Sequence, residues 1–167
     1  MDSAVTLSVV RIWDVSEIID LYRAGGWWEM GYDKDQIPRL LDGSFLVIVA
    51  HDSCGNAVGM GRVISDGASD GYLQDIVVFP EYRNQGIGRR IVFALKQLSL
   101  LYGHTWLGLI SAPGKEEFYK RNGFSEMEKY TPPIRIVCSA RRMKIPPEEE
   151  LSCCSTLLFF AENTSSG

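Results

Sequence analysis

The sequence predicts a single α+β domain with a mixed, mostly antiparallel central sheet and helices packed on it. Three observations predict this fold. A chain of 167 residues has the length of one domain. Two apolar strands separated by a turn-rich loop form a hairpin over 45–65, so they pair antiparallel. A strand, a long helix and another strand follow over 72–110, an order that implies a parallel crossover.

Hydrophobic alternation and turn residues place the strands in order along the chain. They are expected where apolar or β-prone residues run between turns, over 6–11, 45–51, 57–65, 72–79, 105–110, 124–129 and 134–142.

The helices are expected between these strands. A first helix runs to about Tyr22 and is capped by Asp14 or Ser16, and shorter helices are expected over 33–41 and 115–122. The long helix after the loop 83–88 carries one apolar stripe, formed by Ile87, Ile91, Leu95, Leu98 and Tyr102.

Charge and cysteine usage narrow the function classes. With 17 Lys and Arg against 21 Asp and Glu the net charge is −4, which argues against binding along a nucleic acid backbone. The cysteines form neither a zinc-binding pattern nor a disulfide framework, so a reducing, cytoplasmic location is expected. The chain starts without a signal-peptide pattern, and no apolar run reaches membrane-spanning length. We expect residues 1–145 to form the domain and 146–167 a tail, loosely docked on it.

The most informative stretch is the loop 83–88, in which the long helix begins. The first N–H groups of a helix have no partner within the helix, and together with the helix dipole they attract anions. Gly86 and Gly88 remove side chains where a phosphate must approach the backbone, while Arg83, Arg89 and Arg90 add positive charge. The spacing is neither that of a P-loop nor that of a dinucleotide fingerprint. The loop therefore predicts a pyrophosphate site, the alternative being an ordinary glycine-rich turn before a helix.

Two blocks of residues resemble one known family. Arg83-x-x-Gly86-x-Gly88, after the strand Asp75 to Val78, is similar to the acetyl-CoA signature of the GCN5-related N-acetyltransferases, the GNAT family. The block Phe118-Tyr119-Lys-Arg-Asn-Gly123-Phe124 is similar to the Phe-Tyr-x-x-x-Gly-Phe block of that family. The order of elements fits from Thr6 to about Arg142.

The resemblance implies acetyl-CoA as the cosubstrate, without a metal. The strand over 72–79 would splay from the strand over 105–110, and the pantetheine arm would lie in the gap like an added strand. The thioester would lie near Val77 and Val78, where a backbone N–H polarises its carbonyl and fixed donors stabilise the oxyanion. The residues expected to bind the cofactor are Ile76, Val77, Val78, Arg83, Asn84, Gln85, Gly86, Ile87, Gly88 and Arg89.

By the same resemblance, Tyr119 donates a proton to the departing CoA thiolate. A thiol pKa of about 8.5 and a tyrosine pKa of about 10 make this transfer feasible. Adjacent helical residues diverge by about 100°, so we expect Phe118 to face the core and Tyr119 to face the cleft. The alternative is that Tyr119 packs beside Phe118 in the core.

The residue that removes the proton of the amine is left open. Relatives often carry a glutamate on the strand before the loop, but Gln74 and Tyr72 stand at such positions here. Asp75 is the catalytic candidate on this strand, although an acid there can equally organise the backbone or hold substrate. Because side chains alternate along a strand, we expect Asp75 to face opposite to Gln74. Glu29 and Asp33 are further candidates, acting through water.

The acceptor pocket is expected between the first two strands, from Trp27, Trp28, Glu29 and Tyr32. Aromatic rings can stack on an amine and hold its charge by a cation–π contact. The alternative is that the tryptophans pack under the second helix, which we favour for at least one of them.

Together these features predict an N-acetyltransferase that moves an acetyl group from acetyl-CoA directly to a primary amine of a small molecule through a tetrahedral intermediate. One alternative is a protein or peptide N-acetyltransferase. Another is a catalytically silent acyl-CoA-binding regulatory module, because the strand glutamate is missing. The expected partners are acetyl-CoA and a small amine, with a homodimer left open and neither nucleic acid nor a membrane.

Overall fold

The computed structural model describes residues 5–126. The elements follow in the order β1 (Thr6–Val9), α1 (Val15–Ala24), α2 (Gln36–Asp42), β2 (Leu46–His51), β3 (Ala57–Ile64), β4 (Asp70–Val78), a 3₁₀ turn (Pro80–Tyr82), α3 (Ile87–Leu101), β5 (Trp106–Gly108) and α4 (Glu116–Arg121). Every strand and helix predicted up to residue 122 is present, with shifted ends. No helix in this part of the chain is long and apolar enough to cross a membrane.

Some of the predicted elements lie partly or wholly outside residues 5–126. The predicted strand over 124–129 begins in the described part, where 124–126 form no strand. The remainder of that strand, the strand over 134–142, the boundary after residue 145 and the tail over 146–167 lie outside the described residues.

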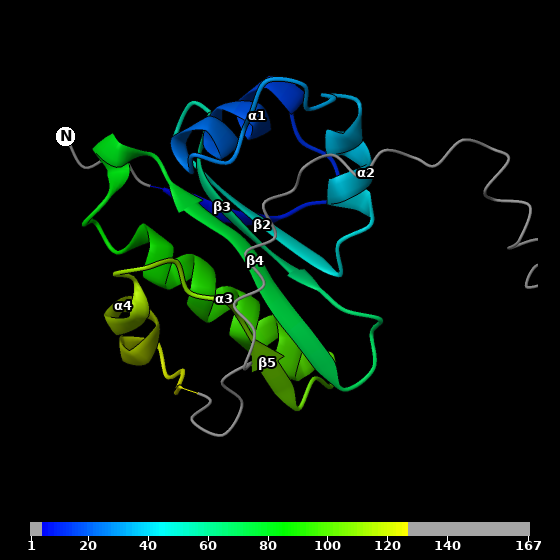
Figure 1. Cartoon of the computed structure of the whole chain (residues 1–167), viewed down its shortest axis with the longest axis vertical. Coiled ribbons are helices and arrows are strands. Elements are labelled where there is room, and N and C mark those ends of the chain that lie inside the picture. The colour runs from blue at the N-terminus through cyan, green and yellow to red at the C-terminus, as the bar shows by residue number, and fades with distance from the viewer. Residues whose placement is uncertain (1–4, 127–167) are drawn as a thin grey trace, which may run out of the picture. The chain divides into compact units, whose positions relative to one another are not determined.

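The strands form one sheet in the order β1-β2-β3-β4-β5. Neighbouring strands from β1 to β4 pair antiparallel, and β4 and β5 pair parallel across the α3 crossover (Figure 1). The predicted mixed, mostly antiparallel sheet with a parallel pair is therefore confirmed.

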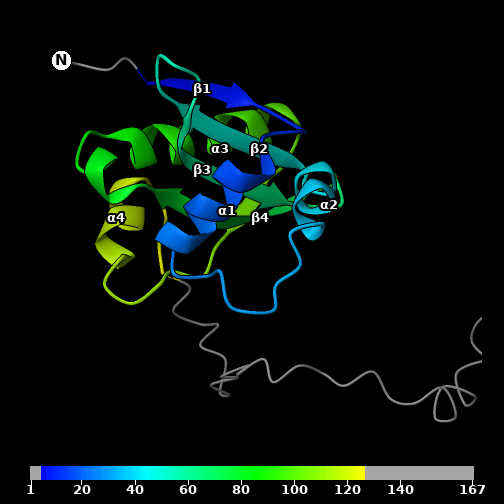
Figure 2. The ribbon, with the colours of Figure 1, turned by 90° about the horizontal axis from the view of Figure 1, so that it is seen from above.

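Helices cover both faces of the sheet (Figures 1 and 2). Along β2, Val47 and Val49 pack in the core under α1 and α2, whereas Ile48 and Ala50 pack in the core under α3. This alternation is the strand period of two, so one apolar strand supplies side chains to both layers.

The helix α1 begins after one of the two predicted capping residues. Asp14 accepts a hydrogen bond from the N–H of Glu17 (3.1 Å), and Ser16 donates its hydroxyl to the same carboxylate. Asp14 is thus the cap, and Ser16 supports it. The helix buries Ile18 and Leu21 completely.

The apolar stripe of α3 is confirmed for its first three residues and wrong for its last. Ile87, Ile91 and Leu95 are buried, but Tyr102 is 59% exposed. Tyr102 lies one residue beyond the helix, and its ring contacts the edge of Phe45 at a centroid distance of 5.7 Å. The stripe ends because the helix ends.

A β-bulge in β4 changes which side chains share a face. Met60 pairs with Val77 and Arg62 with Gln74, so two residues of β4, Asp75 and Ile76, oppose the single residue Gly61. Asp75 has φ +55°, a left-handed backbone. The expectation that Asp75 faces opposite to Gln74 is wrong, because the bulge interrupts the alternation and both side chains contact Arg62.

Substituting Gly61 with alanine tests how closely α3 approaches the sheet. The added Cβ would lie 2.5 Å from Ile76 Cδ1, 2.8 Å from Ile91 Cγ2 and 3.0 Å from Leu95 Cδ1. Overpacking of this kind costs about 1–3 kcal/mol, so Gly61→Ala should lower the free energy of unfolding by that amount in urea titrations. Gly88→Ala is the matched control, because its Cβ has 3.6 Å to the nearest atom. Equal stability of Gly61→Ala and the unsubstituted protein would contradict this packing.

Candidate active site

The loop between β4 and α3 has the backbone of an anion site. Gly86 caps α3 with φ +79°, a conformation that glycine adopts without strain, and Asn84 also has a positive φ of 61°. The N–H groups of residues 84–89 donate to no acceptor within residues 5–126, and the first helical hydrogen bond of this loop runs from Arg90 N to Gly86 O (3.0 Å). A consecutive run of unpaired donors at a helix start binds anions.

The arginines of the loop differ in what they contact. The N–H of Arg83 donates to Pro80 O (3.2 Å), so the expected run of free amides begins at Asn84 rather than at Arg83. The Nε of Arg83 donates to Val78 O (3.0 Å), which ties this side chain to the end of β4. Arg90 donates to Val5 O (2.8 Å) and braces the first strand, whereas Arg89 is exposed beside the free amides.

Within residues 5–126, β4 pairs on one side only beyond its first residues. Its pairing with β5 covers Asp70–Tyr72 opposite Trp106–Gly108, and the described residues give the later part of β4 no pairing except to β3. Figure 1 shows β5 beside only the first part of β4. Main-chain groups alternate in direction along a strand, and Phe79 N–H donates to Val58 O of β3 (2.9 Å). The N–H of Val78 therefore points away from β3, to the side on which the described residues place no strand.

The splayed pair expected from the family resemblance is thus present. The edge of β4 over 76–78 leads directly to the loop with the free amides. Val77 is 5% exposed and packs under α1 and α2, while Ile76 and Val78 pack on the α3 side.

Asp75 lies in a polar group on the face of the sheet covered by α1. Its carboxylate pairs with the Arg62 guanidinium and accepts a hydrogen bond from the Tyr22 hydroxyl at 2.5 Å. Arg62 also donates to Gln74 Oε1 (2.8 Å). Burial, and then the charge of Asp75, raise the pKa of Tyr22 well above its ordinary value. Tyr22 therefore holds its proton at neutral pH and acts as a donor to Asp75.

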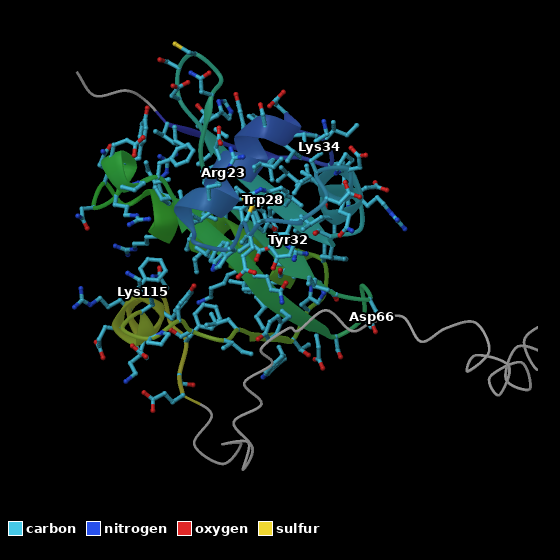
Figure 3. The ribbon with its side chains drawn as sticks, turned by 45° about the horizontal axis from the view of Figure 1, so that its top comes forward. Arg23, Trp28, Tyr32, Lys34, Asp66 and Lys115 are labelled. Atoms are coloured by element: carbon cyan, nitrogen blue, oxygen red, sulfur yellow. The ribbon has the colours of Figure 1, made fainter. Side chains whose placement is uncertain are left out.

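The predicted acceptor residues lie in the loop between α1 and α2. Trp27 is 39% exposed, and its ring contacts Tyr22 edge-on at 5.9 Å. Trp28 is half-buried against the core, as favoured for one tryptophan, and its ring lies 5.7 Å from that of Tyr32. Figure 3 shows Trp28 and Tyr32 next to each other. Glu29 is exposed, so the loop presents aromatic faces and carboxylate together.

The expectation that Phe118 faces the core while Tyr119 faces away from it is wrong. Both are half-buried and pack against the core under α3, with ring centroids 5.0 Å apart. The reason is that a second ring, Phe124, lies 6.0 Å from Tyr119 and covers it. Phe118 approaches the loop, since its Cζ lies 3.6 Å from the ideal Cβ position of Gly88. Burial raises the pKa of Tyr119, so this phenol stays protonated at neutral pH.

A lysine on α3 forms contacts that hold the C-terminal end of α4 in place. Lys96 Nζ donates to Asn122 O (2.6 Å) and lies 5.0 Å from the ring centroid of Phe124. The Asn122 side chain in turn donates to Phe118 O (2.7 Å). A helix of 6 residues is too short to be stable alone, so such contacts hold Tyr119 in place.

The sequence did not identify three residues that hold parts of the predicted site in place: Tyr22 and Arg62 contact Asp75, and Lys96 contacts Asn122 at the end of α4. A charged residue inside the apolar strand 57–65 is a local signal that could have identified Arg62. Tyr22 and Lys96 carry no local signal, because their partners are distant in sequence.

Comparison with known proteins agrees with this geometry. The model of the acetyltransferase (GNAT) domain matches residues 42–126, which is half of the chain. An uncharacterized N-acetyltransferase of Pyropia yezoensis is 24% identical over 117 residues, which cover 69% of this chain and 65% of that protein. The chain thus spans slightly less than two thirds of this relative.

Solved structures share the fold. A GNAT-family acetyltransferase from Streptococcus pneumoniae has a TM-score of 0.63 at 25% identity, over 77% of this chain and 92% of that one. An aminoglycoside N-acetyltransferase in complex with CoA has a TM-score of 0.61 at 15% identity, over 75% and 91% of the two chains. The family expected from the two sequence blocks is confirmed: the chain belongs to the GNAT acetyltransferase family.

Proposed function

We propose that this protein transfers the acetyl group of acetyl-CoA directly to the primary amine of a small molecule. The observation that carries the proposal is the continuity of two unpaired stretches of main chain. The free amides of 84–89 follow directly on the edge of β4 that has parted from β5. A diphosphate joined to an extended arm with amide groups matches this pair of surfaces, and CoA has that structure.

In this proposal, separate groups bind the cofactor, stabilise the oxyanion and protonate the leaving thiolate. The amides of 84–89 and Arg89 bind the diphosphate, and the β4 edge over 76–78 binds the pantetheine arm. The Val78 N–H donates to the thioester carbonyl oxygen, which becomes an oxyanion when the amine nitrogen attacks the carbonyl carbon. As the C–S bond breaks, the electron pair leaves with sulfur, and Tyr119 donates its phenolic proton to the thiolate.

The amine must lose a proton as its nitrogen forms the new amide bond. The catalytic role of Asp75 stays a prediction, and its carboxylate is already bound by Arg62 and Tyr22. Glu29 and Asp33 are exposed in the acceptor loop and are free to act through water. We therefore expect Asp75 to hold its neighbours in place and the loop carboxylates to receive the proton.

The acceptor loop supports a cationic amine as substrate. Trp27 and Tyr32 are exposed aromatics, and Glu29, Asp33 and Asp35 are exposed acids in the same loop. Aromatic faces and carboxylates both attract an ammonium group before it is deprotonated. A protein or peptide amine carries the same charge, so the assay below includes both kinds of acceptor. The cytoplasmic location stays a prediction.

The proposed activity is measured as release of free thiol from acetyl-CoA in the presence of amines. We expect turnover with at least one small primary amine, and no turnover above background with the matching alcohols, because an alcohol is a far weaker nucleophile. Turnover on peptides alone would replace the small-molecule acceptor by a protein. Binding of acetyl-CoA without turnover on any amine would indicate a silent binding module.

Gly88→Ala should separate ligand binding from folding. Its Cβ would make only ordinary contacts with Phe118 and Val78, at 3.6 Å or more, and alanine favours a helix by about 1 kcal/mol. The thermal midpoint should therefore stay equal or rise. Gly88 belongs to the run of free amides that the proposed function assigns to the diphosphate, so a methyl group added there should raise the Kd for acetyl-CoA about tenfold in calorimetry. Unchanged affinity would remove Gly88 from the diphosphate site.

Tyr119→Phe should lower kcat and leave the Kd for acetyl-CoA unchanged. Loss of a general acid costs about 100-fold or more in rate. Because the raised pKa keeps Tyr119 protonated, the ratio of the two rates should be constant from about pH 7 to about pH 9. Tyr102→Phe, an exposed tyrosine beyond the end of α3, is the control. Equal kcat values for Tyr119→Phe and the control would exclude Tyr119 as the proton donor.

A further inference from the structure

Arg62 is a charged residue in the middle of β3 whose side chain is only 13% exposed. Each of its guanidinium nitrogens binds a different residue. Nε binds the Asp75 carboxylate, Nη2 donates to Gln74 Oε1 at 2.8 Å, and Nη1 donates to Ser44 Oγ at 3.2 Å. Ser44 is itself buried and donates its hydroxyl to Leu40 O (2.7 Å) at the end of α2. Arg62 therefore connects Gln74 and Asp75 of β4 to the buried Ser44, which is itself bound to α2.

The two β4 residues that Arg62 holds are those at the bulge. Gln74 still pairs regularly with Arg62 across the sheet, whereas Asp75 adopts φ +55° and begins the irregular stretch opposite Gly61. A left-handed residue other than glycine costs about 1–2 kcal/mol, so contacts of the side chain must maintain it. Arg62 supplies such a contact from β3, and the Tyr22 hydroxyl supplies another from α1.

The bulge lies just past the point at which β4 and β5 part. Their last paired residues are Tyr72 and Gly108, and Asp75 follows three positions later. A bulge bends its strand and increases the local twist. The direction of the edge over 76–78, which the proposed function assigns to the pantetheine arm, is therefore set at Asp75.

We propose that Arg62 is a positioning residue for acetyl-CoA: by holding Gln74 and Asp75 together it fixes the bulge of β4, and so the edge that receives the pantetheine arm. The proposal rests on the proposed function. It assigns Arg62 no contact with the reacting atoms. The proposal also gives a role to the ion pair between Arg62 and Asp75. Apolar side chains alone would favour regular alternation along β4 through Asp75, whereas the ion pair holds the bulge.

The geometry requires arginine rather than any cation. The guanidinium presents N–H groups in fixed directions within a plane, and here they point to three separate acceptors. A lysine ammonium at the end of a flexible stem keeps the charge beside Asp75 but cannot hold Gln74, Asp75 and Ser44 in one arrangement. Arg62→Lys should therefore behave like Arg62→Met.

The test compares two ligands by calorimetry. CoA uses both the loop and the β4 edge, whereas ADP carries a diphosphate but no pantetheine arm. For Arg62→Met and Arg62→Lys we expect the Kd of CoA to rise about tenfold and the Kd of ADP to stay within about twofold of the unsubstituted protein. In the thiol-release assay the KM for acetyl-CoA should rise, and kcat should fall as well, because the same edge carries the Val78 N–H that the proposed function assigns to the oxyanion. Arg23→Met, which removes only an exposed ion pair with Asp20, is the control and should change neither ligand.

Other outcomes decide against the proposal. Equal weakening of CoA and ADP would mean that Arg62 supports the domain as a whole, and unchanged CoA binding would mean that the bulge holds without it. Where the arginine variants do not fold, Tyr22→Phe keeps both charges and removes one donor to Asp75, so it should raise the Kd of CoA alone by a smaller factor. Failure of the unsubstituted protein to bind CoA would instead overturn the proposed function.

Discussion

Main-chain donors without partners form the constraint on which the site depends. A folded domain pairs nearly all of its buried peptide groups, since an unpaired group costs about 1–3 kcal/mol once water is removed. Here the edge of β4 after Tyr72 and the amides of 84–89 have no partner within the described residues, yet they follow one another along the chain. Such a continuous unpaired stretch is maintained at low cost only while water or a ligand with complementary acceptors can reach it.

The two faces of the sheet contribute differently to this stretch. On the α3 side, Ile87, Ile91 and Leu95 pack against β2 and β3, where Gly59 and Gly61 allow the helix to approach closely. This packing fixes the direction in which the free amides point. On the other side, α1 and the loop after it bring Tyr22 and Trp27 to the polar group around Asp75. In the proposed function, one face therefore positions the main chain that would bind CoA, and the other face presents the side chains that would meet the acceptor.

The predicted catalytic tyrosine depends on a weakly supported element. The helix α4 has 6 residues, and its C-terminus is fastened by Lys96 from α3 and by rings that pack on one another. A covered, protonated phenol suits a proton donor because burial disfavours the phenolate. Because the Phe124 ring packs on Tyr119, this side chain lies closer to the core than we expected from the angle of about 100° between adjacent residues of a helix.

The sequence by itself determined the order of the elements, the hairpin, the start of α3 and the loop of free amides, because glycine conformation, helix capping and apolar periodicity act within a few residues. Only the tertiary structure decided that Gln74 and Asp75 share a face, that Trp28 packs while Trp27 stays half-exposed beside Tyr22, and that Tyr119 lies under Phe124. Each of these depends on a partner far away in sequence. Arg62 contacts β4 across the sheet, and Tyr22 reaches Asp75 from another layer, so no local pattern contains them.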